Sequence, residues 1–162
     1  LGATTPSYDL ETPINATFPT EHISDSDIQK ALTALTGDIL QLPPIFSAKR
    51  LNGKRAYHLA RKGESDKALQ PVLITIHSFD LEKREGNMLH ARIRCSKGTY
   101  IRALARDLGV ALNSGAHLTA LRRIQSGTFS VQNAVTIETL EKFLNMHRVT
   151  TEGINTEYMN KK

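Results

Sequence analysis

The 162-residue sequence has a single cysteine, Cys95, and no run of about 18 apolar residues that could span a membrane. One cysteine excludes an internal disulfide framework and a cysteine-based zinc cluster, and it favours the reducing cytoplasm. No secretory signal pattern opens the chain. The six histidines show no metal-ligand spacing such as HExxH, so no metal is expected. No Ser-His-Asp constellation or close carboxylate pair stands out, which argues against a hydrolase.

What the chain does contain is an uneven distribution of charge around a formal net charge of +5. Residues 1–40 carry one base and six acids, whereas residues 41–127 carry sixteen bases and six acids. The basic segment would attract a polyanion such as nucleic acid, although a merely solvated basic face fits the same pattern. The apolar fraction of 40% is sufficient for one core, which argues against wholesale disorder.

The first half of the chain predicts a loop, a helix and a long basic segment. Residues 2–13 have loop composition. Ser24 or Ser26 can cap a helix whose apolar stripe runs from Ile28 to Leu35, and Gly37 ends it. Residues 42–45 contain two prolines and cannot be helical. The basic segment of residues 42–70 is otherwise weakly structured, with a turn at residues 52–53 and a short helix at about residues 55–62.

The second half predicts a hairpin followed by helices. Alternating apolar residues from Val72 to Ile76 predict a strand, and residues 85–87 turn into a second strand. That second strand carries Leu89, Ala91, Ile93 and Cys95 on a packed face and His90, Arg92 and Arg94 on a basic face. Helices are predicted at residues 101–112, 118–124 and 136–144, the last with Ile137, Leu140 and Leu144 facing inward. Residues 128–131 predict a short strand, and the tail from Asn145 is polar.

The junction at residues 95–102, Cys-Ser-Lys-Gly-Thr-Tyr-Ile-Arg, is the segment best suited to chemistry. A strand ends, Gly98 turns the chain, and a helix begins with Thr99 as its cap, so backbone N–H groups point at one place. Tyr100 and Arg102 both project away from the core stripe, and a ring beside a guanidinium suits a stacked base next to an anion. An ordinary strand-to-helix junction explains the same spacing.

Other candidate residues have simpler explanations available. Arg122 and Arg123 either face outward as ligand contacts or stabilise the end of the predicted helix. Asp107 is either a partner for a nearby basic side chain or a surface carboxylate. His117 fits a cap or a packed histidine better than a base. Cys95 fits the core better than a nucleophile.

An ordered set of short motifs, with sensible spacing between them, makes this sequence resemble the TruB family of tRNA pseudouridine synthases over roughly residues 1–144. They are Leu-Gly-Ala-Thr-Thr at residues 1–5 with Asp9, Gly-Asp at 37–38, Gln-Leu-Pro-Pro-Ile-Phe-Ser-Ala-Lys at 41–49, Asn-Gly-Lys-Arg-Ala-Tyr at 52–57, Leu-Ala-Arg-Lys-Gly at 59–63, Cys-Ser-Lys-Gly-Thr-Tyr-Ile-Arg at 95–102, Gly-Ala-His-Leu at 115–118 and Leu-Arg-Arg at 121–123.

The resemblance implies an α+β pseudouridine synthase fold, with a mixed, mostly antiparallel central sheet, flanking helices and a basic thumb loop at about residues 42–71. It implies isomerisation of uridine 55 in the tRNA T loop to pseudouridine, by base flipping and an aspartate nucleophile, without metal or organic cofactor. The expected partner is the T arm of tRNA, the expected state is a monomer in the cytoplasm, and no membrane is involved. Residues 1–144 would be part of the catalytic domain, and residues 145–162 a polar tail without the PUA domain of many relatives.

The family roles carry over residue by residue. Tyr100 matches the tyrosine that packs on the target base, Arg102 the arginine that pairs with the catalytic aspartate, and Leu121 a residue lining the base pocket. The expected RNA contacts are Lys49, Arg50, Lys54, Arg55, Arg61, Lys62, Lys97, Arg122 and Arg123. The aspartate itself belongs to a Gly-His-Thr-Gly-Thr-Leu-Asp-Pro-like motif that precedes the family's Leu-Gly-x-x-Thr segment and does not occur in this sequence. Arg102 is therefore expected to lack its partner here, and an inactive module that grips the T arm is the alternative reading.

Overall fold

The computed structural model describes residues 1–44, 50–51, 54–55 and 70–146, which fall into two compact units. The first unit is Leu1–Leu121 and the second is Arg122–Lys162. The predicted turn at residues 52–53, most of the predicted helix at residues 55–62, and the tail beyond residue 146 lie outside the described residues. Among those described, no helix combines the length and apolarity that crossing a membrane requires.

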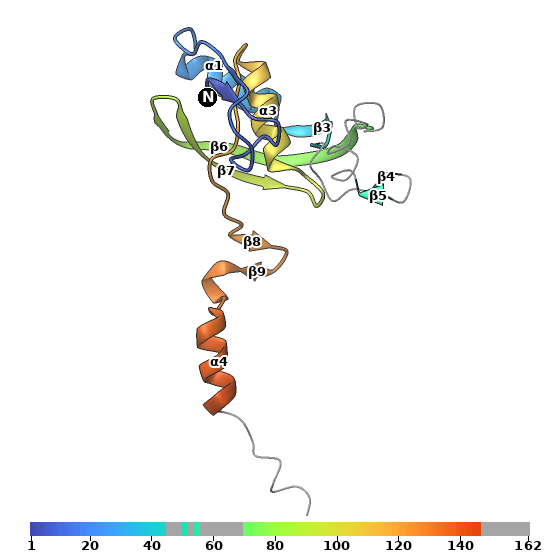
Figure 1. The fold of residues 1–162 in the computed structure, drawn as a ribbon, viewed down its shortest axis with the longest axis vertical. Helices are drawn as coiled ribbons and strands as arrows, with labels where there is room; N and C mark the ends of the chain where they lie inside the picture. Colours follow the sequence, from blue (N-terminus) through green and yellow to red (C-terminus); the bar gives the residue numbers. More distant parts are fainter. Residues whose placement is uncertain (45–49, 52–53, 56–69, 147–162) are drawn as a thin grey trace, which may run out of the picture. The chain divides into compact units, whose positions relative to one another are not determined.

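The first unit is built around a three-stranded antiparallel sheet with strand order β3-β6-β7. The strands are β3 (Gly37–Gln41), β6 (Val72–Glu85) and β7 (Met88–Cys95). Helices α1 (Asp25–Ala34) and α3 (Ile101–Ala111) lie over the same face of this sheet (Figure 1). Two short antiparallel pairs accompany it, β1 (Ala3–Thr4) with β2 (Ala16–Thr17) and β4 (Arg50–Leu51) with β5 (Lys54–Arg55). The predicted α+β class is confirmed.

Helix α1 begins and ends where local chemistry dictates. The Ser24 hydroxyl accepts a hydrogen bond from the Asp27 N–H, and the Asp27 carboxylate accepts one from the Ser24 N–H, which completes a capping box. Ile28 and Leu32 lie on the buried stripe. Gly37, just after the helix, has φ of 98°, a left-handed conformation that glycine adopts at little cost. The predicted helix is confirmed, with Ser24 rather than Ser26 as its cap.

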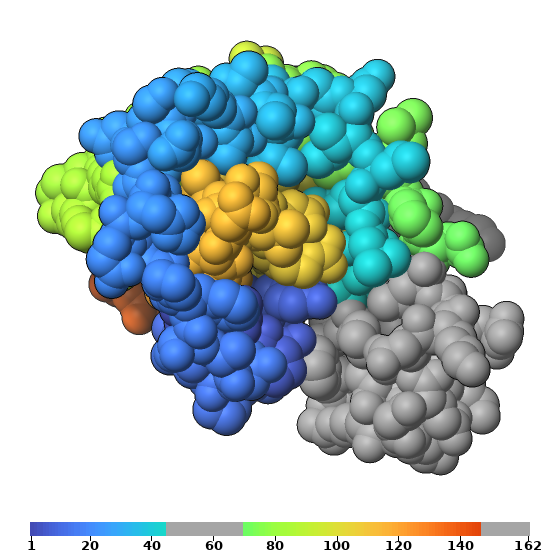
Figure 2. All heavy atoms as spheres, turned by 90° about the horizontal axis from the view of Figure 1, so that it is seen from above, coloured from blue at the N-terminus to red at the C-terminus, as the bar shows by residue number. Residues whose placement is uncertain are grey.

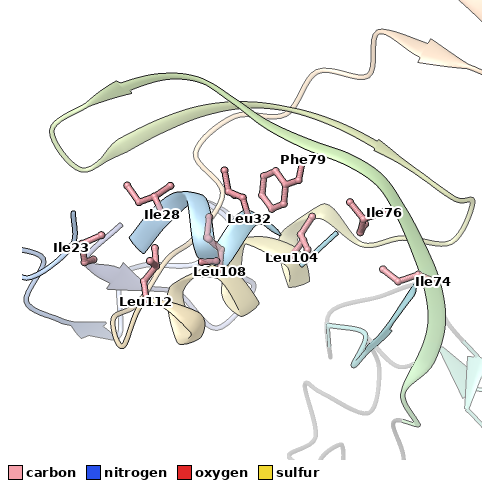
Figure 3. Packing of buried hydrophobic residues seen from close by; sticks show 10 residues of the cluster. Ile23, Ile28, Leu32, Ile74, Ile76, Phe79, Leu104, Leu108 and Leu112 are labelled. Atoms are coloured by element: carbon pink, nitrogen blue, oxygen red, sulfur yellow. The ribbon is translucent and has the colours of Figure 1, made fainter. Parts of the chain in front are cut away.

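The core lies between the two helices and β6. Figure 3 shows Leu104 of α3 and Leu32 of α1 near Phe79 of β6, and Leu108 of α3 and Ile76 of β6 belong to the same buried cluster. Ile76 and Phe79 are three residues apart, yet they share one face because a register shift between Ile76 and Ser78 changes the alternation. Burial of each such side chain stabilises the fold by about 1.5–3 kcal/mol. Cys95 packs half-buried against the same cluster, as the sequence predicts.

The outer face of β7 is less basic than the sequence alone suggests. Arg92 forms an ion pair with Glu82 of β6 at 2.6 Å, and His90 lies 3.0 Å from Glu85. Acidic residues contributed by the neighbouring strand therefore offset part of the predicted positive charge. Ala91, predicted on the packed face, is exposed.

The helix predicted at residues 118–124 is wrong. This segment has no regular secondary structure, and the Leu118 N–H donates to the Tyr8 carbonyl at 2.9 Å instead of to a helical neighbour. In the second unit, β8 (Gln125–Ser126) pairs with β9 (Phe129–Ser130), and a 3₁₀ turn (Val131–Asn133) leads to α4 (Ile137–Met146). The last predicted helix is thus confirmed, but its supposed inward face is wrong, because Ile137, Leu140 and Leu144 are exposed.

Gly109, within α3, is a close-packing position, so Gly109→Ala is expected to destabilise the protein. In an open helix the added methyl would help by about 1 kcal/mol. Here a Cβ would overlap the Ala116 nitrogen and lie 2.7 Å from the Gly115 carbonyl carbon, so the backbone must move. We expect a net loss of about 1–3 kcal/mol in the free energy of unfolding, measured by urea denaturation. Val110→Ala, on the exposed side of the same helix, is the control; equal stability of both variants would contradict the close packing.

Candidate active site

The start of α3 is held by a side chain from another strand. Tyr100 occupies the N-cap position with an extended backbone, and its own side chain makes no capping bond. Thr99, the predicted cap, instead donates to the Ser96 carbonyl at 2.9 Å. The Tyr100 N–H donates to the Gln41 Oε1 at 2.8 Å. The helix start is therefore capped from β3.

In the first turn of α3, Arg102 forms an ion pair with Asp9. Its Nη1 lies 2.9 Å from Asp9 Oδ2 and 3.3 Å from the Ser7 carbonyl oxygen. The two side chains are only 21% and 17% exposed. An ion pair shielded from water is screened less than a surface pair and holds its geometry better. Asp9, which the sequence did not single out, is thus an anionic partner of Arg102 within this chain, distinct from the catalytic aspartate of the family.

Both carboxylate oxygens of Asp9 accept hydrogen bonds. Oδ1 accepts from the Ser7 hydroxyl at 2.5 Å and from the Glu11 N–H at 3.0 Å, while Oδ2 accepts from Arg102. Partial burial acts to raise the pKa of Asp9, but the bonds from Ser7 and Glu11 and the charge of Arg102 outweigh it and lower the pKa below its ordinary value. Asp9 is therefore a fixed anion that orients Arg102, and it is poorly placed to attack a substrate.

Several side-chain hydrogen bonds hold the loop that carries Asp9 in place. The Thr5 hydroxyl donates to the Asp9 carbonyl at 2.6 Å, and the Ser7 and Thr12 hydroxyls are 2.7 Å apart. Thr5 and Ser7 are buried. Tyr8, between them and Asp9, has φ of 62°, which a non-glycine residue adopts only where its surroundings enforce it.

Arg106, one turn after Arg102, fastens the same loop to α3. Its guanidinium carbon lies 5.1 Å from the centre of the Tyr8 ring, and it pairs with Asp107 at 2.7 Å. Burial acts to lower the pKa of Arg106, but hydrogen bonds to Tyr8 and Asp107 raise it above its ordinary value. Of the two readings of Asp107, the structure supports a partner for a basic side chain.

An open pocket of about 440 Å³ lies beside the Asp9–Arg102 pair. Its lining consists of Asp9, Leu10, Glu11, Arg102, Leu118, Thr119, Ala120 and Leu121. The pocket thus combines an oriented ion pair with apolar side chains, two of which, Leu10 and Leu121, are each 63% exposed. Such a site suits a flat, partly apolar ligand with polar edges.

The wall formed by residues 118–121 is fixed to the N-terminal segment. The Gly2 N–H donates to the Gly115 carbonyl at 2.7 Å, and His117 Nδ1 lies 3.0 Å from the Ala3 carbonyl. A carbonyl only accepts, so Nδ1 carries the proton. Figure 2 shows the N-terminal segment and α1, in blue, around α3, in yellow to orange. The predicted packing role of His117 fits this contact.

The structure brings two predicted site residues, Arg102 and Leu121, into one pocket, whereas Tyr100 does not line it. Lys97 is exposed in the turn before α3. Arg122 and Arg123 are exposed in the second unit and are not on a helix. Arg50, Lys54 and Arg55 belong to β4 and β5, whereas Lys49, Arg61 and Lys62 lie outside the described residues. Among the residues described, no three His, Cys, Asp or Glu side chains are grouped to hold a metal ion.

Two family models match the chain. One, described as TruB family pseudouridylate synthase (N terminal domain), matches residues 1–101, and the other, tRNA pseudouridylate synthase B C-terminal domain, matches residues 102–160. A tRNA pseudouridine synthase B of Phocaeicola vulgatus is 48% identical over 149 residues, which are 92% of this chain and 63% of the relative.

Two further relatives carry the same name. The protein of Flavobacterium johnsoniae is 49% identical over 144 residues, 89% of this chain and 62% of its own length. That of Aromatoleum aromaticum is 49% identical over 142 residues, 87% of this chain and 45% of its own length. The chain therefore spans less than two thirds of each of these relatives.

Proposed function

Since this chain belongs to the TruB family of pseudouridylate synthases, we propose that the full-length protein isomerises uridine 55 in the T loop of tRNA to pseudouridine. The observation that carries the proposal is the oriented Arg102 in a pocket whose other wall holds Leu121. The relatives' name supports tRNA as the substrate. A monomer that acts in the cytoplasm, where tRNA is available, without metal or organic cofactor completes the proposal.

The reaction rearranges one base without net gain or loss of atoms. The bond from C1′ of the ribose to N1 of uracil breaks, the uracil turns, and a bond from C1′ to C5 forms. The hydrogen on C5 leaves as a proton, and N1 gains one. The base must first leave its stacked position in the loop. We propose that the base stacks on the Tyr100 ring, which lies outside the pocket lining but two residues before Arg102, and that Leu121 covers the apolar face of the base. Such stacking offsets about 1–3 kcal/mol of that cost.

Arg102 provides the fixed positive charge that this chemistry requires. In the family the nucleophile is an aspartate in a segment that precedes the one matching Leu1, and we propose that the full-length protein supplies it there. A guanidinium oriented by Asp9 can form an ion pair with that second carboxylate and keep it ionised. Tyr100, two residues earlier on the same helix start, would receive the C5 proton.

The basic thumb segment is proposed to grip the RNA backbone. Lys54 and Arg55 lie in β5, which pairs with β4, and the surrounding residues 41–127 carry a net positive charge. Lys49, Arg50, Arg61, Lys62, Lys97, Arg122 and Arg123 are the further proposed phosphate contacts. Basic side chains that neutralise phosphates make binding salt-dependent, because counterions are released.

Replacing both Lys54 and Arg55 by glutamine is therefore expected to weaken tRNA binding at low salt. The slope of log affinity against log salt should become shallower by about two contacts. The control is the double variant Lys30→Gln, Lys83→Gln, which removes the same charge from exposed residues that pair with Asp27 and Glu85. Filter binding across a salt series measures both. If the two double variants behave alike, the segment does not grip phosphates.

A further inference from the structure

Gln41, the last residue of β3, has a completely buried side chain. It is 1% exposed, among the most buried side chains of the described residues. A primary amide removed from water costs free energy unless both its N–H₂ and its oxygen find partners. Glutamine is therefore an unusual choice for this position unless the amide holds something in place.

Both partners of the Gln41 amide belong to one residue, Tyr100. Oε1 accepts from the Tyr100 N–H at 2.8 Å, and Nε2 donates to the Tyr100 carbonyl at 3.2 Å. The same carbonyl accepts the first bond of α3, from the Leu104 N–H at 3.1 Å. One side chain thus fixes the N–H and the C=O of the residue where the helix begins, 59 positions away in sequence.

Gln41 also stands at the root of the basic thumb segment. Pro43 and Pro44, which follow it, are buried. The carbonyl of Leu42 accepts from Arg106 Nη2 at 3.1 Å, one turn beyond Arg102 on α3. The chain leaving β3 is therefore attached to α3 twice, through Gln41 at the helix start and through Arg106 farther along.

We propose that Gln41 is a positioning residue: its amide fixes the Tyr100 backbone, and with it the start of the helix that carries Arg102, to the root of the thumb segment. This inference rests on the proposed function, because it assigns the fixed geometry to turnover. A ring that must stack on a flipped base tolerates little displacement, and an error of 1 Å in a site costs about 100-fold in rate. Binding of tRNA by the thumb and orientation of Tyr100 then share one anchor.

Gln41→Met tests the proposal, because methionine has a similar length but makes neither bond. In the full-length protein we expect kcat to fall about 10- to 100-fold while the affinity for tRNA changes less than about twofold. A merely structural role would lower thermal stability and leave kcat per folded molecule unchanged. The control is Ser114→Ala, which removes another buried bond, from the Ser114 hydroxyl to the Pro19 carbonyl at 3.0 Å, outside the pocket lining.

Gln41→Glu provides a second variant with its own signature. A neutral carboxyl group matches the amide, since its O–H can donate to the Tyr100 carbonyl and its C=O can accept the N–H. An ionised one repels the carbonyl. Burial raises the pKa of such a carboxyl, so kcat relative to the wild type should rise as the pH falls from about 8 to about 6.

The outcomes separate the two claims. Wild-type turnover in folded Gln41→Met overturns the positioning role and leaves the proposed function intact. So does a kcat of Gln41→Glu whose ratio to the wild-type kcat does not change between about pH 8 and about pH 6. If Gln41→Met does not fold, the pH ratio alone decides. A wild-type protein that forms no pseudouridine overturns the proposed function and this inference with it.

Discussion

Replacing Arg102 by alanine is expected to abolish pseudouridine formation, with kcat lowered by at least about 1000-fold. The guanidinium is the fixed positive charge beside the pocket, and alanine leaves the buried side of Asp9 without its countercharge. Binding of tRNA should persist, because Arg102 points at Asp9 and the Ser7 carbonyl inside the protein. Single-turnover kinetics with saturating enzyme, together with filter binding, separates these two effects.

Arg84→Ala is the matched control for that variant. Arg84 also pairs with one aspartate, Asp25, at 2.6 Å, and it donates to the backbone carbonyls of Ile23 and Gly86, each at 3.1 Å. Its side chain is 25% exposed. It does not line the pocket. The control should therefore lose a little stability and keep turnover. Near-normal product formation by Arg102→Ala would remove Arg102 from the mechanism.

Asp9→Asn is expected to lower kcat about 100-fold while the protein still folds. Asparagine can accept the bonds from Ser7 and Glu11 through its oxygen, but its amide nitrogen faces Arg102 with a donor where the carboxylate had an acceptor. The guanidinium then loses its fixed orientation. The catalytic aspartate that we propose for the full-length protein therefore loses a well-placed ion-pair partner. Asp25→Asn, which breaks the corresponding pair of Arg84, is the control. Equal turnover in Asp9→Asn and wild type would show that Arg102 needs no orientation by Asp9.

The same pair predicts a pH effect on stability. The pKa of Asp9 is below its ordinary value of 3.8, so its contribution is complete above that value and is lost as the pH falls through the lowered pKa. Asp9→Asn should accordingly be less stable than wild type at neutral pH, by about 1–3 kcal/mol, and the difference should shrink in acid below about pH 4. Thermal unfolding between pH 7 and strong acid checks this, and a constant difference would contradict the assigned ionisation.

The elements that the sequence predicts correctly are those with strong local signals. The capping pattern at Ser24 and the apolar stripes of α1 and α3 need no distant partner, and the alternation in β6 and β7 is equally local. Strand β3 escaped prediction because five residues including Gly37 and Asp38 carry a weak strand pattern, and pairing with β6 decides their conformation. The segment from Leu118 to Ile124 repeats apolar residues at helical spacing, but its backbone bonds to Tyr8 far away in sequence.

The site divides in the same way. The family's sequence motifs identify roles for Tyr100, Arg102 and Leu121. Asp9 also lies in one of these motifs, but the sequence assigns it no role. Its function follows from the loop that folds Ser7, Asp9 and Glu11 around one carboxylate and from an arginine 93 positions away. Gln41 likewise lies in a motif that gives it no role. Only the packing of β3 against α3 reveals its hydrogen bonds to Tyr100.

The most direct measurement is nucleoside mapping of an unmodified tRNA transcript after incubation with the full-length protein. The expected result is one pseudouridine per tRNA, at position 55 of the T loop, with none formed by Arg102→Ala and none in a transcript that carries cytidine there. A transcript that is bound but keeps uridine at position 55 would contradict the enzyme and leave an RNA-gripping module in its place.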